Sequence, residues 1–145
     1  MAYLATNYAS SPNAPADKWV CAPGSRLGPF DTVPTTNTGH PDYCGQCVSY
    51  VKTVCPVLPA TAAWKKGEAA KGNKNILAGT VIATFNANDQ YEGHAAIYVS
   101  QDDLGLRVYD QYIYGRVPKA VGPRTLRFGA QGDSNNGDKF FVVEQ

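Results

Sequence analysis

The chain lacks the features that define several large classes of protein. No apolar run approaches the roughly 18–20 residues that a membrane span needs, and the first ten residues lack the basic and then apolar pattern of a Sec-type signal peptide. Neither sign of charge is in excess, with 13 Lys and Arg against 12 Asp and Glu. We therefore predict no surface for nucleic acid and none for an anionic membrane. Histidine occurs only twice and cysteine only four times.

What is present suits a folded domain. Of the 145 residues, 43% are hydrophobic and 17% are charged, which is enough to bury a core. Six of the ten prolines fall within the first 43 residues, where they favour irregular structure over a helix. We expect a single domain over residues 1–145, with an irregular proline-rich lead over 1–39 and a core over 40–145.

The hydrophobic pattern predicts helices first and strands afterwards. Three valines at three-residue spacing predict a helix over 46–54, which Pro56 ends. Residues 60–71 predict one or two short helical turns. Runs rich in β-formers between turn residues predict strands over 79–85, 94–100, 106–114, 124–128 and 139–145. This order predicts an α+β fold in which N-terminal helices pack on an antiparallel sheet of four to six strands.

Cys47 falls in the first turn of the predicted helix, where the helix dipole favours a thiolate and free N–H groups can bind an oxyanion. His94 begins a predicted strand and is the candidate base. Asp110 interrupts an apolar face of the next strand, where a carboxylate needs a partner, and neighbouring strands bring side chains within about 5 Å. The pattern predicts Cys47 as nucleophile, His94 as base and Asp110 as the residue that orients it, with Gln111 as the fallback.

Other interpretations of the cysteines stay open. The pair Cys44-x-x-Cys47 is also compatible with a redox site or with part of a zinc site, although no strand is predicted to lead into it and no second ligand pair follows. A structural Cys47 in a non-catalytic wall-binding or protein-binding module is an alternative of another class. If Cys47 is a free nucleophile, the remaining cysteines Cys21, Cys44 and Cys55 allow three different bridges, and their spacing does not choose among them.

Two motifs resemble those of known thiol hydrolases. Gly45–Val51, GQCVSYV, and Gly93–Val99, GHAAIYV, are similar to the Cys and His motifs of CHAP and NlpC/P60 peptidoglycan amidases, which are papain-like. Over about residues 40–145, the chain further resembles the small amidase effectors of type VI secretion, and among these the third amidase-effector family. The additional segments that carry this second resemblance are Trp64–Gly67, Gly79–Phe85 and Val108–Tyr112.

This resemblance implies a papain-like peptidoglycan amidase or endopeptidase that cleaves peptide stems or crosslinks through a cysteine thioester, with no cofactor and no metal. The D-Ala–meso-diaminopimelate crosslink is the expected bond. The resemblance also implies export through a type VI apparatus without a Sec signal, action in the periplasm of a target bacterium, and a cognate periplasmic immunity protein that blocks the active site. A phage-type or housekeeping cell-wall amidase is the alternative with the same chemistry.

The roles carried over by position agree with those derived from the pattern. Cys47 matches the nucleophile and His94 the base, and Asp110 matches a third position at which related families carry either an acid or an amide. The N–H of Cys47 is expected to bind the oxyanion together with a second donor. Candidates for that donor or for substrate binding are Gln46, Tyr43 and Gln111.

Overall fold

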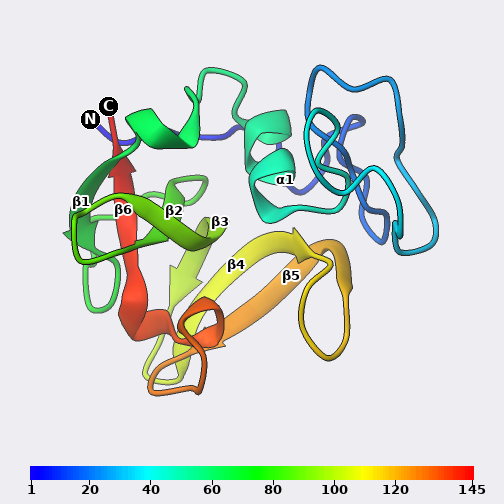
Figure 1. Ribbon diagram of the computed structural model, residues 1–145. Helices are drawn as coiled ribbons and strands as arrows, with labels where there is room; N and C mark the ends of the chain where they lie inside the picture. Colours follow the sequence, from blue (N-terminus) through cyan, green and yellow to red (C-terminus); the bar gives the residue numbers. More distant parts are fainter.

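The computed structural model describes residues 1–145 and is organised around a six-stranded antiparallel sheet with one α-helix (Figure 1). The strands lie in the order β1-β6-β2-β3-β4-β5. No helix has the length and apolar character that crossing a bilayer requires. The elements in chain order are α1 (Cys47–Val54), η1 (Thr61–Ala63), β1 (Lys65–Ala69), β2 (Val81–Phe85), β3 (Tyr91–Gln101), β4 (Gly105–Tyr112), β5 (Lys119–Arg127), η2 (Asp133–Asn135), η3 (Gly137–Lys139) and β6 (Phe140–Glu144).

The predicted α+β class, the helix and the five predicted strands are confirmed. Strands β2 to β5 form a meander in which each strand pairs with the next, as the short turns between them indicated. Strand β5 begins at Lys119, five residues before the predicted start. The last strand, β6, crosses to the far side of the meander and pairs with β2.

The prediction of helical turns over 60–71 is wrong for most of that segment. Only the three residues of η1 form a helical turn, and Lys65–Ala69 form the edge strand β1, which pairs with β6. The unpaired N–H and C=O groups of β6 give this segment a partner that local helix propensity does not reveal. Gly67 lets the two strands approach, because a Cβ there would lie 2.8 Å from the carbonyl oxygen of Val142.

The sheet carries a packed core on each of its two faces. Ala95 and Ile97 of β3 belong to the same core cluster as the buried residues of α1. Ala96 and Tyr98 point to the opposite face, which is also buried, against Leu106 and other residues of a second cluster. The face of β3 that carries His94 is therefore closed by side chains along most of its length.

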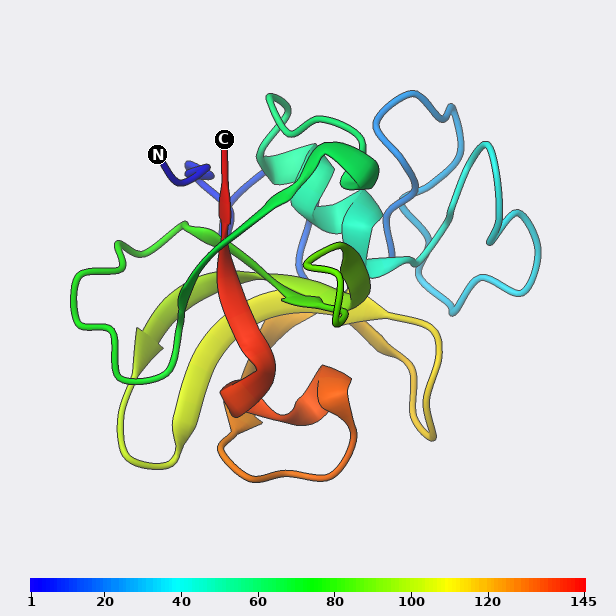
Figure 2. The same ribbon diagram turned by 60° about the vertical axis from the view of Figure 1, so that its left-hand side comes forward.

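The N-terminal lead is irregular, as predicted, and lies beside α1 (blue to cyan in Figures 1 and 2). Ala5, Ala14 and Val20 belong to the same core cluster as α1. The lead is joined to the sheet through backbone hydrogen bonds, and its first residues reach the C-terminal strand. The amino group of Met1 lies 2.9 Å from the carboxylate of Glu144, so the two ends of the chain are neighbours.

Candidate active site

Cys47 is positioned by a sharp turn just before α1. Gly45 has a φ of 80°, which favours glycine, and a side chain there would collide with Ile113 at the end of β4. The N–H of Gly45 donates to the carbonyl of Val20 at 2.9 Å. The helix then begins at Cys47 itself, which is buried. Its N–H is one of the groups at a helix start that have no acceptor within the helix.

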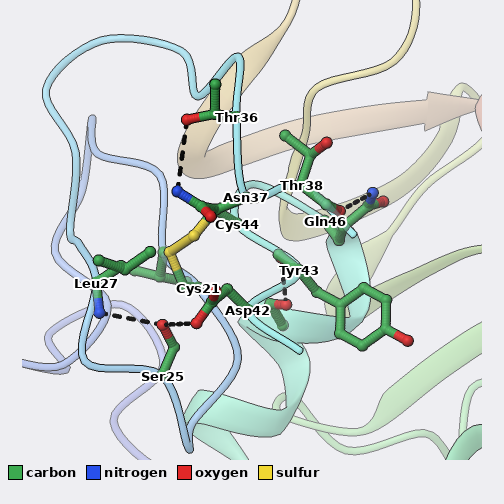
Figure 3. The surroundings of a disulfide bond; sticks show 12 residues. Cys21, Ser25, Leu27, Thr36, Asn37, Thr38, Asp42, Tyr43, Cys44 and Gln46 are labelled. Atoms are coloured by element: carbon green, nitrogen blue, oxygen red, sulfur yellow. Dashed lines mark hydrogen bonds between the residues drawn. A yellow bond between two sulfur atoms is a disulfide. The ribbon is translucent and has the colours of Figure 1, made fainter. Parts of the chain in front are cut away.

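A disulfide joins the lead to this turn (Figure 3). The bond links Cys21 to Cys44, so it selects one of the three bridges that the sequence left open. Cys44 is bonded to Cys21 and not to Cys47, which removes the basis for a redox pair at Cys44-x-x-Cys47. Cys47 and Cys55 are free and buried. No group of three or more His, Cys, Asp and Glu side chains is arranged to hold a metal ion.

His94 and Asp110 form the hydrogen-bonded pair that the sequence predicted. Nε2 of His94 lies 2.7 Å from Oδ2 of Asp110, and both side chains are buried. Continuing the register of Tyr98 with Val108 places Asp110 one pleat away from His94 on the same face. Because Nε2 is engaged with the carboxylate, Nδ1 is the ring nitrogen left to face the sulfur of Cys47.

Asp110 is also flanked by two cations that the sequence analysis missed. Arg124 donates to Oδ2 from Nε at 3.0 Å and from Nη2 at 2.8 Å. Nζ of Lys119 lies 3.2 Å from Oδ1, but it donates to three carbonyl oxygens, so Oδ1 receives its charge without a directed hydrogen bond. Arg124 and Lys119 lie on β5; the strand predicted at 124–128 begins at Arg124 and leaves out Lys119, and neither side chain was predicted to face Asp110.

These contacts shift the ionisation of the candidate nucleophile and base toward a charged pair. Burial alone would raise the pKa of Cys47, but the imidazole of His94 and the hydroxyl of Tyr91 lower it below the ordinary value of a thiol. Burial likewise opposes protonation of His94, but Asp110 and Cys47 outweigh it and raise the pKa of His94 to about 9. The arrangement therefore favours a thiolate beside an imidazolium.

The Asp110 carboxylate stays ionised in this setting. Burial would raise its pKa, but the hydrogen bond with His94 and the charge of Arg124 hold that pKa well below the usual range. The carboxylate therefore holds the imidazolium ring in place and remains charged at every pH at which the protein is expected to work.

The remaining predicted site residues occupy three different settings. Gln111 is fully buried away from His94, where it binds both backbone groups of Val20 and the carbonyl of Gln46. The side-chain amide of Gln46 donates to the carbonyl of Thr38 at 2.8 Å and to the Tyr114 hydroxyl at 3.1 Å. The ring of Tyr43 is exposed and points away from the disulfide (Figure 3). Gln111 thus positions the turn before α1, and it does not contact the His94 ring.

Two clefts meet at Cys47. The first, here called the His94 cleft, has a volume of about 550 Å³ and includes Arg116, Arg124 and the η2 loop in its wall. The second, here called the Tyr91 cleft, has a volume of about 540 Å³ and includes Tyr91 in its wall. Gln46, Cys47 and Gly93 line both clefts, whereas His94 lines only the first. An extended chain can therefore pass over the sulfur with one arm in each cleft.

Comparison with known proteins gives three concordant matches. The family model "Domesticated amidase effector 2" matches residues 29–143. The chain is similar to the domesticated amidase effector 2 of Ixodes scapularis, with 39% identity over 68% of this chain and 70% of that protein. It is also similar to the type VI secretion amidase effector 2 protein of Salmonella typhi, with 36% identity over 68% of this chain and 84% of that protein.

A solved structure agrees with these sequence matches. The type 6 secretion amidase effector 2 (Tae2) has a TM-score of 0.58 and 36% identity with the chain, over 68% of this chain and 80% of that one. The predicted resemblance to amidase effectors is confirmed, and the matches are to the second amidase-effector family where the sequence analysis favoured the third. The family model starts at residue 29, so most of the lead lies outside it.

Proposed function

Because the chain belongs to the domesticated amidase effector 2 family, we propose that it is a cysteine peptidoglycan amidase with Cys47 as nucleophile. The observation that carries this proposal is the position of Cys47, which begins α1 beside the buried His94–Asp110 pair at the junction of two clefts. A cysteine that was only structural would need neither the imidazole nor access from both sides.

The geometry supports a two-step acyl transfer. The Cys47 thiolate attacks the carbonyl carbon of a peptide bond, and the helix-start N–H of Cys47 donates to the oxygen as it becomes negative. His94 then gives its Nδ1 proton to the leaving amine, which departs and leaves a thioester on Cys47. Neutral His94 next takes a proton from water as the water attacks the thioester, and the thiolate and the imidazolium are restored as the acid is released. Throughout, Asp110 holds Nε2.

The two clefts indicate the direction in which the substrate binds. Since His94 supplies the proton to the leaving amine and lines only the His94 cleft, the amine-bearing half of the substrate lies there and the acyl half lies in the Tyr91 cleft. The His94 cleft contains the guanidinium of Arg116, which forms no ion pair, and the carboxylate of Asp133. These two charges match the carboxylate and the emerging ammonium on one carbon of meso-diaminopimelate. The D-Ala–meso-diaminopimelate crosslink is the bond we propose.

The proposal also covers the delivery of the protein, the compartment in which it acts and the protein that inhibits it. One relative is named a type VI secretion effector, and we propose the same delivery for this chain, with action in the periplasm of a target bacterium. A cognate immunity protein that fills the two clefts would protect the producer. The lead is tied to the core by a disulfide and by shared packing, which supports residues 1–145 as a single amidase domain.

Digestion of purified sacculi tests the activity and the bond together. Wild-type protein, Cys47→Ala and the matched control Cys55→Ala, which removes the other free thiol, are incubated with sacculi, and the muropeptides are separated and identified by mass. We expect wild type and Cys55→Ala to convert crosslinked dimers to monomers, and Cys47→Ala to leave them intact. Equal loss of dimers with Cys47→Ala, or none with wild type, would overturn the proposal. Cleavage within the peptide stem alone would support the proposed amidase activity and reject the crosslink as the bond that is cleaved.

Two simple observations address the alternatives. A gene for a small protein with a periplasmic signal beside this gene favours the effector, whereas phage or cell-division neighbours favour a phage-type or housekeeping wall amidase. Iodoacetamide should alkylate Cys47 well below pH 8, because the thiolate forms there. A non-catalytic module with a structural Cys47 would resist alkylation at that pH.

A further inference from the structure

Arg124 connects the buried His94–Asp110 pair with the wall of the His94 cleft. Its Nε and Nη2 atoms donate to Oδ2 of Asp110 at 3.0 and 2.8 Å. The same guanidinium also donates from Nη1 to the side-chain oxygen of Asn135 at 2.8 Å and from Nη2 to the carbonyl of Ser134 at 3.3 Å. Both of these residues belong to η2, which forms part of the cleft wall.

We propose, resting on the function proposed above, that Arg124 is a positioning residue that holds the Asp110 carboxylate and the Gly132–Asn135 loop in fixed relation. His94 then faces a leaving-amine cleft of constant shape. Arg124 acts through Asp110 on one side and through the loop on the other. Its Nη2 also lies 3.3 Å from Nε2 of His94, the ring nitrogen that does not face Cys47.

No other side chain of the protein binds both the Asp110 carboxylate and the loop. His94 and Arg124 are the two side chains that donate hydrogen bonds to the Asp110 carboxylate, and both bind Oδ2. Lys119 is near Oδ1 but donates its protons to carbonyl groups of β4 and β5. The planar fork of arginine can bind the carboxylate and the loop at once, which a lysine ammonium at the same position cannot reproduce.

The guanidinium is itself held in a defined orientation. Its central carbon lies 4.9 Å from the centre of the Tyr112 ring, and this ring packs edge-on against the ring of His94 at 6.0 Å. Tyr112 therefore contacts both the imidazole and the guanidinium. This contact explains how a long arginine side chain that lines a cleft stays ordered enough to position its neighbours.

The charge of Arg124 gives the proposal a pH-dependent consequence. Removing one positive charge near Cys47 and His94 destabilises the thiolate and stabilises the imidazolium, so both ionisations move to higher pH. The titratable and charged groups that face the His94–Asp110 pair from the elements around it are Cys47 and Tyr50 on α1, Tyr91 on β3, Tyr112 on β4, Lys119 on β5 and Asp133 on η2. All of these residues are kept when Arg124 alone is changed, although the charge of Arg124 also contributes to the lowered pKa of Lys119.

Three variants separate the charge from the tether. Arg124→Met removes the positive charge and the hydrogen bonds to Asp110 and the loop, and it keeps an aliphatic side chain over Tyr112. Arg124→Lys keeps the charge but lacks the planar, forked guanidinium. Asn135→Ala removes the main side-chain contact of Arg124 with the loop and leaves the hydrogen bonds to Asp110 in place. Arg107→Met is the matched control, because Arg107 lies on the neighbouring strand β4, also forms an ion pair, with Asp102 at 2.6 Å, and lies outside both clefts.

Two readouts are measured for each variant after circular dichroism has shown that it folds. The first is kcat and KM on a purified crosslinked muropeptide. The second is the rate of Cys47 alkylation by iodoacetamide against pH, which needs no substrate. We expect Arg124→Met to lower kcat/KM about tenfold or more and to move the alkylation profile to higher pH. Arg124→Lys should have the wild-type pH dependence of alkylation but a raised KM. Asn135→Ala should raise KM and leave the pH dependence of alkylation unchanged.

The outcomes distinguish this proposal from the function on which it rests. Lack of turnover by wild type, or equal turnover by Cys47→Ala, rejects the proposed function, and the alkylation profiles still test Arg124. The role of Arg124 is overturned if Arg124→Met matches Arg107→Met in both readouts, or if Arg124→Lys is no better than Arg124→Met in its alkylation profile. If Arg124→Met fails to fold, Arg124→Lys and Asn135→Ala test the proposal instead. An unchanged KM in both variants would overturn the role of Arg124 in holding the Gly132–Asn135 loop.

Discussion

The hydroxyl of Tyr91 lies 3.5 Å from the sulfur of Cys47, and the ring of Tyr91 packs edge-on against Trp64 with 4.9 Å between the ring centres. Trp64 is buried, and its indole N–H donates to the carbonyl of Pro59 at 3.0 Å. The segment between α1 and β1 therefore fixes a hydroxyl beside the sulfur. Tyr91 lies three residues before His94, outside the motif that identified the site.

Replacing Tyr91 with Phe should make the Cys47 sulfur less reactive without disturbing the packing. The Tyr91 hydroxyl helps to lower the pKa of Cys47, so its loss should raise that pKa and slow alkylation at neutral pH. We expect kcat/KM to fall about threefold to tenfold, as for loss of one typical hydrogen bond, with little change in melting temperature. Tyr109→Phe, which removes a hydroxyl on β4 away from the sulfur, is the control. Unchanged alkylation in Tyr91→Phe would contradict this role.

The rate of cleavage should have a bell-shaped dependence on pH with a broad plateau below about 9. The rate rises as Cys47 loses its proton, at a pH below the ordinary value of a thiol because His94 lowers the pKa against the effect of burial. It falls again as the imidazolium of His94 deprotonates, with a pKa of about 9. Initial rates on muropeptide dimers from pH 4 to 10 test this. A rate that still climbs through pH 9 would mean that no ion pair forms in the resting protein.

Asp110 and Gln111 should respond differently to removal of their polar groups. Asp110→Asn leaves Arg124 and Lys119 without their buried carboxylate and His94 without its anionic partner, so we expect kcat to fall at least about a hundredfold and the free energy of unfolding to fall by about 3 kcal/mol. Gln111→Met should lower stability by a similar amount, because it leaves backbone groups of Val20 and Gln46 unpaired. It should retain the pH profile of the wild type.

The stability of the wild type should itself depend on pH through this pair. His94 has a folded-state pKa of about 9, above its unfolded value of about 6.5. The stabilisation is therefore fully present below pH of about 6.5 and is lost as the pH rises through about 9. Urea unfolding at several pH values measures it. In Asp110→Asn this decline should be much smaller, and an identical decline in both proteins would assign it to other groups.

Reduction of the Cys21–Cys44 disulfide should destabilise the fold. The bond joins residues 23 positions apart. Disulfides that close loops of this length add about 3 kcal/mol to the free energy of unfolding. For a chain of this size, that loss lowers the melting temperature by roughly 10 °C. Thermal unfolding with and without dithiothreitol measures the difference. The double variant Cys21→Ser/Cys44→Ser should melt at the temperature of the reduced wild type, and dithiothreitol should not change it. Cys55→Ser should lose stability on reduction as the wild type does.

The elements that could be predicted from the sequence are those whose pattern is local. The valines of α1 repeat along one helix face, and the strands of the meander alternate between short turns. The edge strand β1 was missed because it pairs with β6, about 75 residues later, and its own sequence favours helix. No second core was predicted on the face of β3 that carries Ala96 and Tyr98, because the residues that cover it come from other strands.

The same distinction holds for the candidate site. Cys47, His94 and Asp110 follow from residue types at the start of a helix and on neighbouring strands. Arg124 and Lys119 were missed because a cation on a strand usually lies in solvent, and only the register of β5 with β4 places these two beside Asp110. The disulfide partner of Cys44 depended on the path of an irregular lead, which no periodic pattern describes.

The bond between Cys44 and Cys21 determines how Cys47, the proposed nucleophile, responds to oxidation. Oxidation of Cys47 to a sulfenic acid is normally reversed through condensation with a nearby thiol. The cysteine three residues upstream has no thiol to offer, because its sulfur is already bonded to Cys21. The other free thiol, Cys55, lies beyond the far end of α1, about 12 Å away along the helix axis. Within the folded chain, Cys47 therefore has no resolving partner, and its recovery from oxidation depends on a small thiol from outside.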